Sequence, residues 1–152
     1  MPEAKECERV NRNINALWDF IKEMNNWAQC MPGFVSFEEQ DENTSIWHLK
    51  GDGKLLKRKI CFTVKVIEKI KPERIVFTIE SKNEGITGEG SYLAKSAGNG
   101  ATDVEFFLKL TGRGMKKQMV NSYLKKSLPK DCKTLKEGLF QVLGIYGKSI
   151  KV

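Results

Sequence analysis

The sequence has one histidine, His48, and no pair of cysteines close enough together for a zinc site or a thiol-exchange motif. Its four cysteines are separated by 23, 31 and 71 positions: Cys7, Cys30, Cys61 and Cys132. We therefore predict reduced, mostly packed thiols, with no metal and no cofactor. A Ser/His/Asp or Cys/His catalytic centre would depend entirely on His48, which argues against a conventional hydrolase.

Long apolar runs are also missing, since no stretch approaches the roughly 18 to 20 residues that span a bilayer. The first residues, MPEAKE, include acidic side chains and no apolar segment, so they do not resemble a secretory signal. The chain has 152 residues, of which 40% are hydrophobic and 30% charged, as in soluble globular proteins. We predict a single cytoplasmic domain over residues 1–152.

Positive charge is concentrated near the C-terminal end of the sequence. Residues 1–112 contain 16 basic and 17 acidic side chains (−1), whereas residues 113–152 contain 10 basic and 2 acidic ones (+8). A basic amphipathic helix can adsorb to anionic lipid, and the candidate contacts are Lys116, Lys117, Lys125, Lys126 and Lys133. The alternative is a solvated outer face. Nucleic acid is disfavoured because the aromatic residues cluster in strand-like segments instead of alternating with the lysines.

Two short helices are predicted near the N-terminus, after a polar strand candidate at Glu3–Val10 that would form a sheet edge. Asn13 is a suitable N-cap for a helix with apolar residues at i, i+3, i+4 and i+7. These residues are Ile14, Leu17, Trp18 and Ile21. A second apolar helix, around Trp27–Cys30, is expected to end at Pro32-Gly33.

From residue 34 to residue 111 the apolar period changes to two, which is typical of strands with one buried face. Hydrophobic and polar residues alternate in six short segments, for example Ile60–Val66 and Val104–Leu110, and turns such as Gly98-Asn99-Gly100 separate them. We predict an α+β fold with an antiparallel sheet of about seven strands. One face of this sheet is apolar and needs a cover.

A long amphipathic helix near the C-terminal end is the predicted cover. Two series recur at every fourth residue: Met115, Met119 and Tyr123, and Val120, Leu124 and Leu128. Pro129 interrupts this pattern. Because proline lacks an N–H donor and clashes with the preceding turn, we expect a kink there, or a restart with Pro129 at the first helical position.

Four passages carry a family resemblance together: Trp18-Asp19-Phe20, Trp27–Phe34 with its Pro-Gly pair, the glycine-bearing Gly85–Gly90, and Gly100-Ala101-Thr102. With the order of elements, they resemble the START-related helix-grip superfamily, also called SRPBCC, and within it the CoxG-like group, which is named after a protein of carbon monoxide dehydrogenase. The resemblance covers Lys5 to Leu143. It implies a curved antiparallel sheet wrapped around a long, kinked C-terminal helix, with two short helices between the first and second strands.

The resemblance also implies a deep apolar cavity between sheet and helix, which holds a lipid, a quinone, a polyketide or another hydrophobic small molecule. The residues agree, because glycines remove side-chain volume from a strand and methionines form adaptable walls. The alternative is that the glycines only allow the sheet to coil and the methionines fill the core. The expected ligand-binding residues are Phe62, Val64, Phe77, Gly88, Gly90, Tyr92, Phe106, Leu108, Met115, Met119 and Tyr123.

Three functions stay open from the sequence. The first is a non-catalytic carrier or accessory protein, monomeric or weakly dimeric, for a hydrophobic small molecule. The second is a polyketide cyclase, aromatase or hydratase on the same fold, with a tyrosine or histidine as general acid; fold analogy does not separate these two. The third is peripheral association with an anionic membrane surface at its cytoplasmic face. We predict no catalytic residue, since His48 alternates with Trp47 and Leu49 and points to solvent if they point inward.

Overall fold

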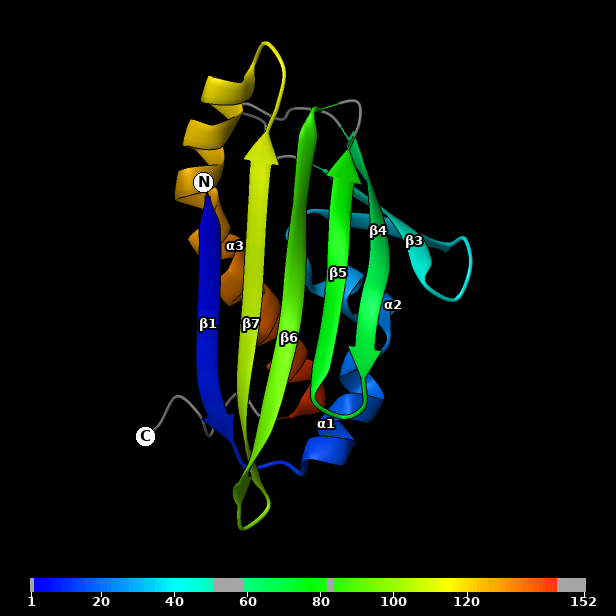
Figure 1. Cartoon of the computed structure of the whole chain (residues 1–152), viewed down its shortest axis with the longest axis vertical. Helices are drawn as coiled ribbons and strands as arrows, with labels where there is room; N and C mark the ends of the chain where they lie inside the picture. Colours follow the sequence, from blue (N-terminus) through cyan, green and yellow to red (C-terminus); the bar gives the residue numbers. More distant parts are fainter. Residues whose placement is uncertain (1, 51–58, 82–83, 145–152) are drawn as a thin grey trace.

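The computed structural model describes residues 2–50, 59–81 and 84–144 (Figure 1). Within these ranges the elements follow one another as β1 (Glu3–Val10), α1 (Ile14–Ile21), α2 (Met24–Cys30), β2 (Phe34–Glu39), β3 (Thr44–Lys50), β4 (Lys59–Ile70), β5 (Arg74–Ser81), β6 (Ile86–Gly98), β7 (Ala101–Gly112) and α3 (Lys117–Leu143). The strands form one antiparallel sheet in the order β1-β7-β6-β5-β4-β3-β2. The predicted α+β helix-grip architecture is confirmed.

The three helices lie on the same side of the sheet (Figure 1). α3 packs mainly on β7 and β1, whereas α2 packs on β2 and on α3. α3 turns one apolar stripe toward the sheet, and its buried apolar residues are Val120, Leu124, Leu128, Cys132, Leu135, Leu139 and Phe140. Helices of this kind are stabilised mainly by burial of such a stripe.

The predicted start of α1 is confirmed in detail. The side chain of Asn13 accepts a hydrogen bond from the backbone N–H of Asn15 at 2.8 Å, as an N-cap should. α2 is tied to α1 by Trp27, whose indole Nε1 donates to the carbonyl oxygen of Ile21 at 2.7 Å. Trp27 is completely buried, so this bond satisfies a polar group in the core.

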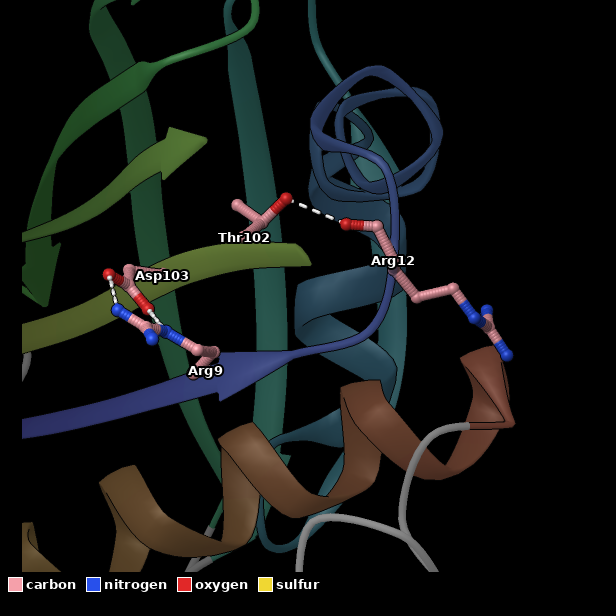
Figure 2. A network of polar contacts seen from close by, with 4 residues as sticks. All are labelled: Arg9, Arg12, Thr102 and Asp103. Atoms are coloured by element: carbon pink, nitrogen blue, oxygen red, sulfur yellow. Dashed lines mark hydrogen bonds and ion pairs between the residues drawn. The ribbon is translucent and has the colours of Figure 1, made fainter. Parts of the chain in front are cut away.

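β1 is the edge strand expected from its polar sequence, and it pairs with β7. At its end, Arg9 forms a two-pronged ion pair with Asp103, at 2.6 and 3.0 Å (Figure 2). Beside it, the hydroxyl of Thr102 donates to the carbonyl oxygen of Arg12 at 2.7 Å. Figure 2 also shows the Arg12 side chain extending toward the C-terminal end of α3. These contacts fix the connection between β1 and α1.

Nearer the middle of β1, two glutamates that face α3 form ion pairs with a lysine of that helix. The ammonium nitrogen of Lys136 lies 3.0 Å from a carboxylate oxygen of Glu6 and 2.9 Å from one of Glu8. The Lys136 side chain is only 12% exposed. This Glu6–Lys136–Glu8 cluster therefore clamps α3 onto the sheet edge.

Pro129 does not restart a helix, because α3 runs as a single element from Lys117 to Leu143 with Pro129 inside it. Pro129 is exposed, as is Lys125, whose carbonyl oxygen loses its usual helical donor. On the solvent side of a helix, water can satisfy such a carbonyl. The proline therefore sits where its missing hydrogen bond costs least.

Candidate functional site

A cavity of about 380 Å³ lies between the sheet and the N-terminal half of α3. Its wall is largely apolar: Trp47, Leu49, Ile60, Phe62, Ile79, Ile86, Leu108, Leu110, Leu124 and Leu128. Volumes of about 300 to 1,000 Å³ with mostly apolar walls are typical of small-molecule sites. We call this region, from β3 to β7 under the first half of α3, the cavity half of the interior.

The other half of the interior is filled by aromatic rings. Trp27 packs edge-on against Phe77 and Phe106, with ring centroids 5.3 and 5.6 Å apart. Phe106 also contacts Tyr92 at 5.5 Å and Phe140 at 5.9 Å. All five side chains are at most 2% exposed. We call this cluster of Trp27, Phe77, Tyr92, Phe106 and Phe140 the aromatic half.

The cavity therefore includes only part of the predicted ligand-binding set. Phe62, Leu108 and Tyr123 line it. Four other predicted residues are buried in the packed core: Val64, Phe77, Tyr92 and Phe106. Alternation along the strands identified the inward-facing positions correctly, but it contained no signal for which end of each strand would stay open.

Gly88 and Gly90 do not open space, in contrast to our expectation. A Cβ atom at Gly90 would lie 2.5 Å from the ring of Phe77, and one at Gly88 would collide with the Lys109 carbonyl oxygen and lie 2.6 Å from a methyl group of Leu110. The volume that the glycines release is thus occupied by neighbouring atoms. Their role is close packing over β6, as in the alternative interpretation that the glycines serve the sheet.

Met115 and Met119 lie outside the cavity and not along its wall. Met115 precedes α3 and is fully exposed, and Met119 is 53% exposed. Of the two series with four-residue spacing, the one that contains Val120, Leu124 and Leu128 faces the sheet. Met119 is turned toward solvent because adjacent helical residues differ by about 100°, whereas Tyr123, one turn later in the same series, still lines the cavity.

The mouth of the cavity is formed by polar residues and by the loop after α2. Lys50 and Lys130 are exposed, and Asp131 is half-buried. In the loop, Gly33 has φ +78°, and its carbonyl oxygen accepts a hydrogen bond from the Lys50 backbone at 2.7 Å. A Cβ atom at Gly33 would collide with the Lys50 carbonyl oxygen. The Pro-Gly passage thus shapes the rim through a conformation that favours glycine.

Three buried hydroxyls have no hydrogen-bond partner among the described residues, those of Ser81, Tyr92 and Ser127. Of the three, Ser127 lines the cavity, and it is 8% exposed. Tyr92 lies in the aromatic half, and burial raises the pKa of its phenol well above the ordinary value. An unpaired buried polar group costs about 1 to 3 kcal/mol. Ser127 is therefore the unpaired group most accessible to a bound guest.

The remaining predicted positions lie at the surface or on the outer face of the sheet. The lysines proposed to contact a membrane, Lys116, Lys117, Lys125, Lys126 and Lys133, are all exposed.

Trp47 and Leu49 face inward, as predicted for a strand in which His48 faces outward. The His48 ring nitrogen lies 2.7 Å from a carboxylate oxygen of Glu38. His48 is therefore separated from the cavity by the sheet.

Burial also affects the thiols. The pKa of Cys132 is raised to about 12, first by burial and then by the charge of Glu6.

Within residues 2–50, 59–81 and 84–144, no group of three or more histidine, cysteine, aspartate or glutamate side chains is placed to hold a metal ion. Over the same residues, no helix has the length and apolar character needed to cross a bilayer.

Sequence reasoning missed most of the cavity wall and its rim. The missed lining residues include Ile60, Ile79, Ile86, Leu110, Leu124, Ser127 and Leu128. Most of them follow the same period-two or period-four patterns as the residues that were chosen. No residue type marks the cavity end of these strands in the sequence, since the aromatic Phe62 lines the cavity and the aliphatic Ile75 lies in the packed core.

One protein-family model matches residues 1–145. A search of curated protein sequences found no match. Solved structures match over nearly the whole chain. A protein from Thermus thermophilus has a TM-score of 0.72 at 17% identity, over 94% of this chain and 98% of that one.

Two further structures bear descriptive names. A START superfamily protein from Mycobacterium smegmatis has a TM-score of 0.68 at 12% identity, over 99% of both chains. The ZhuI aromatase/cyclase from a Streptomyces species has a TM-score of 0.62 at 12% identity, over 92% of this chain and 94% of that one. At these identities the likeness establishes a shared START-like helix-grip fold.

Proposed function

Because the chain belongs to the family whose model matches residues 1–145 and has the START-like helix-grip fold, we propose that it binds a hydrophobic small molecule as a carrier or accessory protein. The cavity of about 380 Å³ is the observation that supports this proposal. Its wall is built from leucine, isoleucine and aromatic side chains that water solvates poorly. An apolar guest that replaces water there gains the free energy of apolar burial.

The lining also indicates the chemistry of the guest. The Ser127 hydroxyl lies in the wall, with Tyr123 and Asp131 one helical turn away on either side, and it has no hydrogen-bond partner among the described residues. Serine has one side-chain torsion, so its hydroxyl reorients at little cost. We expect an elongated apolar molecule with one hydroxyl or carbonyl group near Ser127. A lipid, a quinone or a polyketide-like compound fits this description.

Within the helix-grip proteins, we propose that the chain is related to the CoxG-like group. The support is the Trp27–Phe34 passage, in which Gly33 adopts a positive φ and closes the rim against Lys50. Sequence comparison of this passage with CoxG-like proteins tests the assignment, and replacement of Gly33 by alanine tests whether the passage shapes the rim. We expect Gly33→Ala to weaken ligand binding by displacing the rim, because alanine tolerates this φ poorly.

Ligand binding can be tested with a pair of variants on β5. Ile79 lines the cavity, and Val76 lies on the opposite face of the same strand. Ile79→Phe extends a ring into the cavity and should abolish binding of a fluorescent fatty acid or quinone. Val76→Phe adds the larger side chain outside the cavity and should leave the titration unchanged. Native mass spectrometry of the purified wild-type protein would identify a co-purified guest.

The proposal fails if no molecule co-purifies, no apolar probe saturates a site, and Ile79→Phe behaves like the wild type. A result in which both β5 variants lose binding equally would indicate general destabilisation. Thermal melts of both variants, measured in the same buffer, identify that case.

A cyclase or hydratase is the alternative on this fold, and the site gives it less support. Tyr123 lines the cavity, but His48 lies on the outer face of the sheet and Tyr92 is outside the cavity lining. The double variant Tyr92→Phe/His48→Ala should keep ligand affinity within about tenfold if the protein is a carrier. A catalyst that depends on either group should lose about 10² to 10⁴ in rate.

A further inference from the structure

The N-terminal part of α3 and the turn before it form an exposed surface of unusual composition. Residues 113–130 contain six basic side chains and no acidic one. All six are exposed: Arg113, Lys116, Lys117, Lys125, Lys126 and Lys130. Two large apolar side chains stand among them, Met115 at 104% and Met119 at 53% relative exposure. We call this set the Met–Lys surface.

Exposed apolar side chains among basic ones are unfavourable in water and favourable at a lipid interface. Methionine has a flexible, unbranched side chain that adapts to a disordered environment. Lysine places its ammonium group in the headgroup layer while its carbon chain lies deeper. A shallow groove borders this surface, and Glu3 of β1 lines it together with Arg113, Lys117 and Lys125. The balance remains strongly positive.

The same helix face leads to the mouth of the cavity. Met119, Tyr123, Lys126 and Lys130 follow one another at i, i+4, i+7 and i+11, so they form one stripe along α3. Tyr123 and Lys130 both line the cavity. A flat surface that covers Met119 therefore also lies next to the rim.

We propose that the Met–Lys surface docks on an anionic phospholipid bilayer, with Met115 and Met119 inserted among the headgroups and the cavity mouth held beside the membrane. This inference rests on the proposed function, since it gives the route by which an apolar guest enters or leaves. A hydrophobic molecule then moves between bilayer and cavity without crossing open water.

Vesicle co-sedimentation of the full chain tests the charge requirement. We expect binding to phosphatidylcholine vesicles that contain phosphatidylglycerol, and little binding to phosphatidylcholine alone. Lys116→Glu/Lys117→Glu should weaken binding at least tenfold, since each basic residue near an anionic surface contributes about fivefold. Lys69→Glu/Lys71→Glu is the matched control, because these lysines are exposed at the β4–β5 turn. Added salt should release the wild type.

The insertion of the methionines is tested separately on the same helix. Met119→Asn, combined with Met115→Asn, should reduce vesicle binding about tenfold through lost apolar burial. Val142→Asn is the control, since Val142 is 66% exposed near the other end of α3. Peroxide oxidation gives a direct readout: anionic vesicles should protect Met115 and Met119 and leave the half-buried Met24 unchanged.

Several outcomes would overturn the inference. Equal binding to neutral and anionic vesicles excludes docking through charge. Loss of binding in the lysine variant with no effect of the methionine variant, or binding to RNA as tight as to vesicles, indicates adsorption of any polyanion. Titration of an apolar probe in solution without vesicles reports on the cavity alone. If the protein binds the probe but no vesicles, the proposed function stands and only the docking is refuted.

Discussion

The aromatic half and the cavity half share the same sheet and the same helix, yet buried rings pack together in one and a cavity opens in the other. On β5, Ile75 lies in the filled end and is fully buried, and Ile79 lines the cavity two inward positions away. On β7, Phe106 packs against Trp27, and Leu108 already faces the cavity. The difference follows from which element meets the sheet, because Trp27 of α2 packs against the rings of Phe77 and Phe106 in the aromatic half.

The placement of the helices reinforces this difference. α1 and α2 bring Trp27 over the aromatic half, where its indole is anchored to Ile21. α3 packs mainly on β7 and β1. The inner faces of β3, β4 and β5 border the cavity at the other end, through Trp47, Phe62 and Ile79. The aromatic half should therefore contribute most to stability, and the cavity half should bind the ligand.

The largest expected effect comes from removing a ring in each half. Phe106→Ala should lower the free energy of unfolding by about 3 to 5 kcal/mol, because Phe106 is fully buried against three other rings. Phe62→Ala should cost about half as much, since Phe62 borders existing empty space. Urea denaturation of both variants measures the difference. Equal losses would contradict the division into two halves.

Replacing an isoleucine by the larger phenylalanine should destabilise the aromatic half more than the cavity half. Ile75→Phe should cost about 1 to 3 kcal/mol, because Ile75 is fully buried and lies outside the cavity lining. Ile79→Phe should be tolerated nearly without loss, since the new ring enters the cavity. Thermal unfolding distinguishes the two variants. If Ile79→Phe destabilised the protein as much as Ile75→Phe, the cavity would not accept a guest without rearrangement.

The Glu6–Lys136–Glu8 cluster tests what holds α3 against β1. Lys136→Met should cost about 1 to 2 kcal/mol at neutral pH, which allows for partial solvent screening. Burial opposes the charge of Lys136, but its hydrogen bonds to Glu8 and Glu6 outweigh burial and raise its pKa above the ordinary lysine value. A raised folded-state pKa stabilises the fold below that ordinary value, and this stabilisation disappears as pH rises through the folded-state pKa.

Urea unfolding of the wild type and Lys136→Met as a function of pH checks this sign. The stability difference should be constant near neutrality and shrink in alkaline solution. A difference that persists unchanged above the folded-state pKa would mean that Lys136 acts through its apolar chain and not through its charge.

The smallest effects concern two of the unpaired hydroxyls. Tyr92→Phe should leave stability unchanged or raise it by about 1 kcal/mol, because it removes an unsatisfied hydroxyl from the aromatic half. Ser127→Ala should have a similar effect on stability but should weaken binding of a ligand that bears a hydroxyl or carbonyl group. Paired stability and binding measurements separate the two. Reduced stability of Tyr92→Phe would indicate that its hydroxyl has a partner in solution.

The strands, the inward or outward direction of their side chains and the start of α1 could be predicted, because each depends on residues close together in the sequence. Period-two alternation places Phe62 and Leu108 inward, and Asn13 has the side chain that caps a helix. The outward placement of His48 follows from the same alternation. These features depend on residues a few positions apart, which a single sequence displays directly.

The cavity itself could not be placed because its position depends on packing between distant segments. Gly90 suggested empty space, but Phe77 from the neighbouring strand occupies it. Met119 shares its four-residue spacing with Tyr123, and spacing alone cannot say which of two helix faces meets the sheet. Pro129 suggested a break, but its exposed position allows α3 to continue. Each difference was settled by tertiary packing or solvent exposure, which a single sequence does not display.

Methyl NMR spectroscopy during titration with a quinone or a fatty acid is the most direct test of the hollow half. The account predicts saturable shifts for the methyl groups of Ile60, Ile79, Ile86 and Leu124, with Ile75 and Val104 unchanged. Shifts spread evenly over both halves, or none in the cavity methyl groups at saturating ligand, would contradict it.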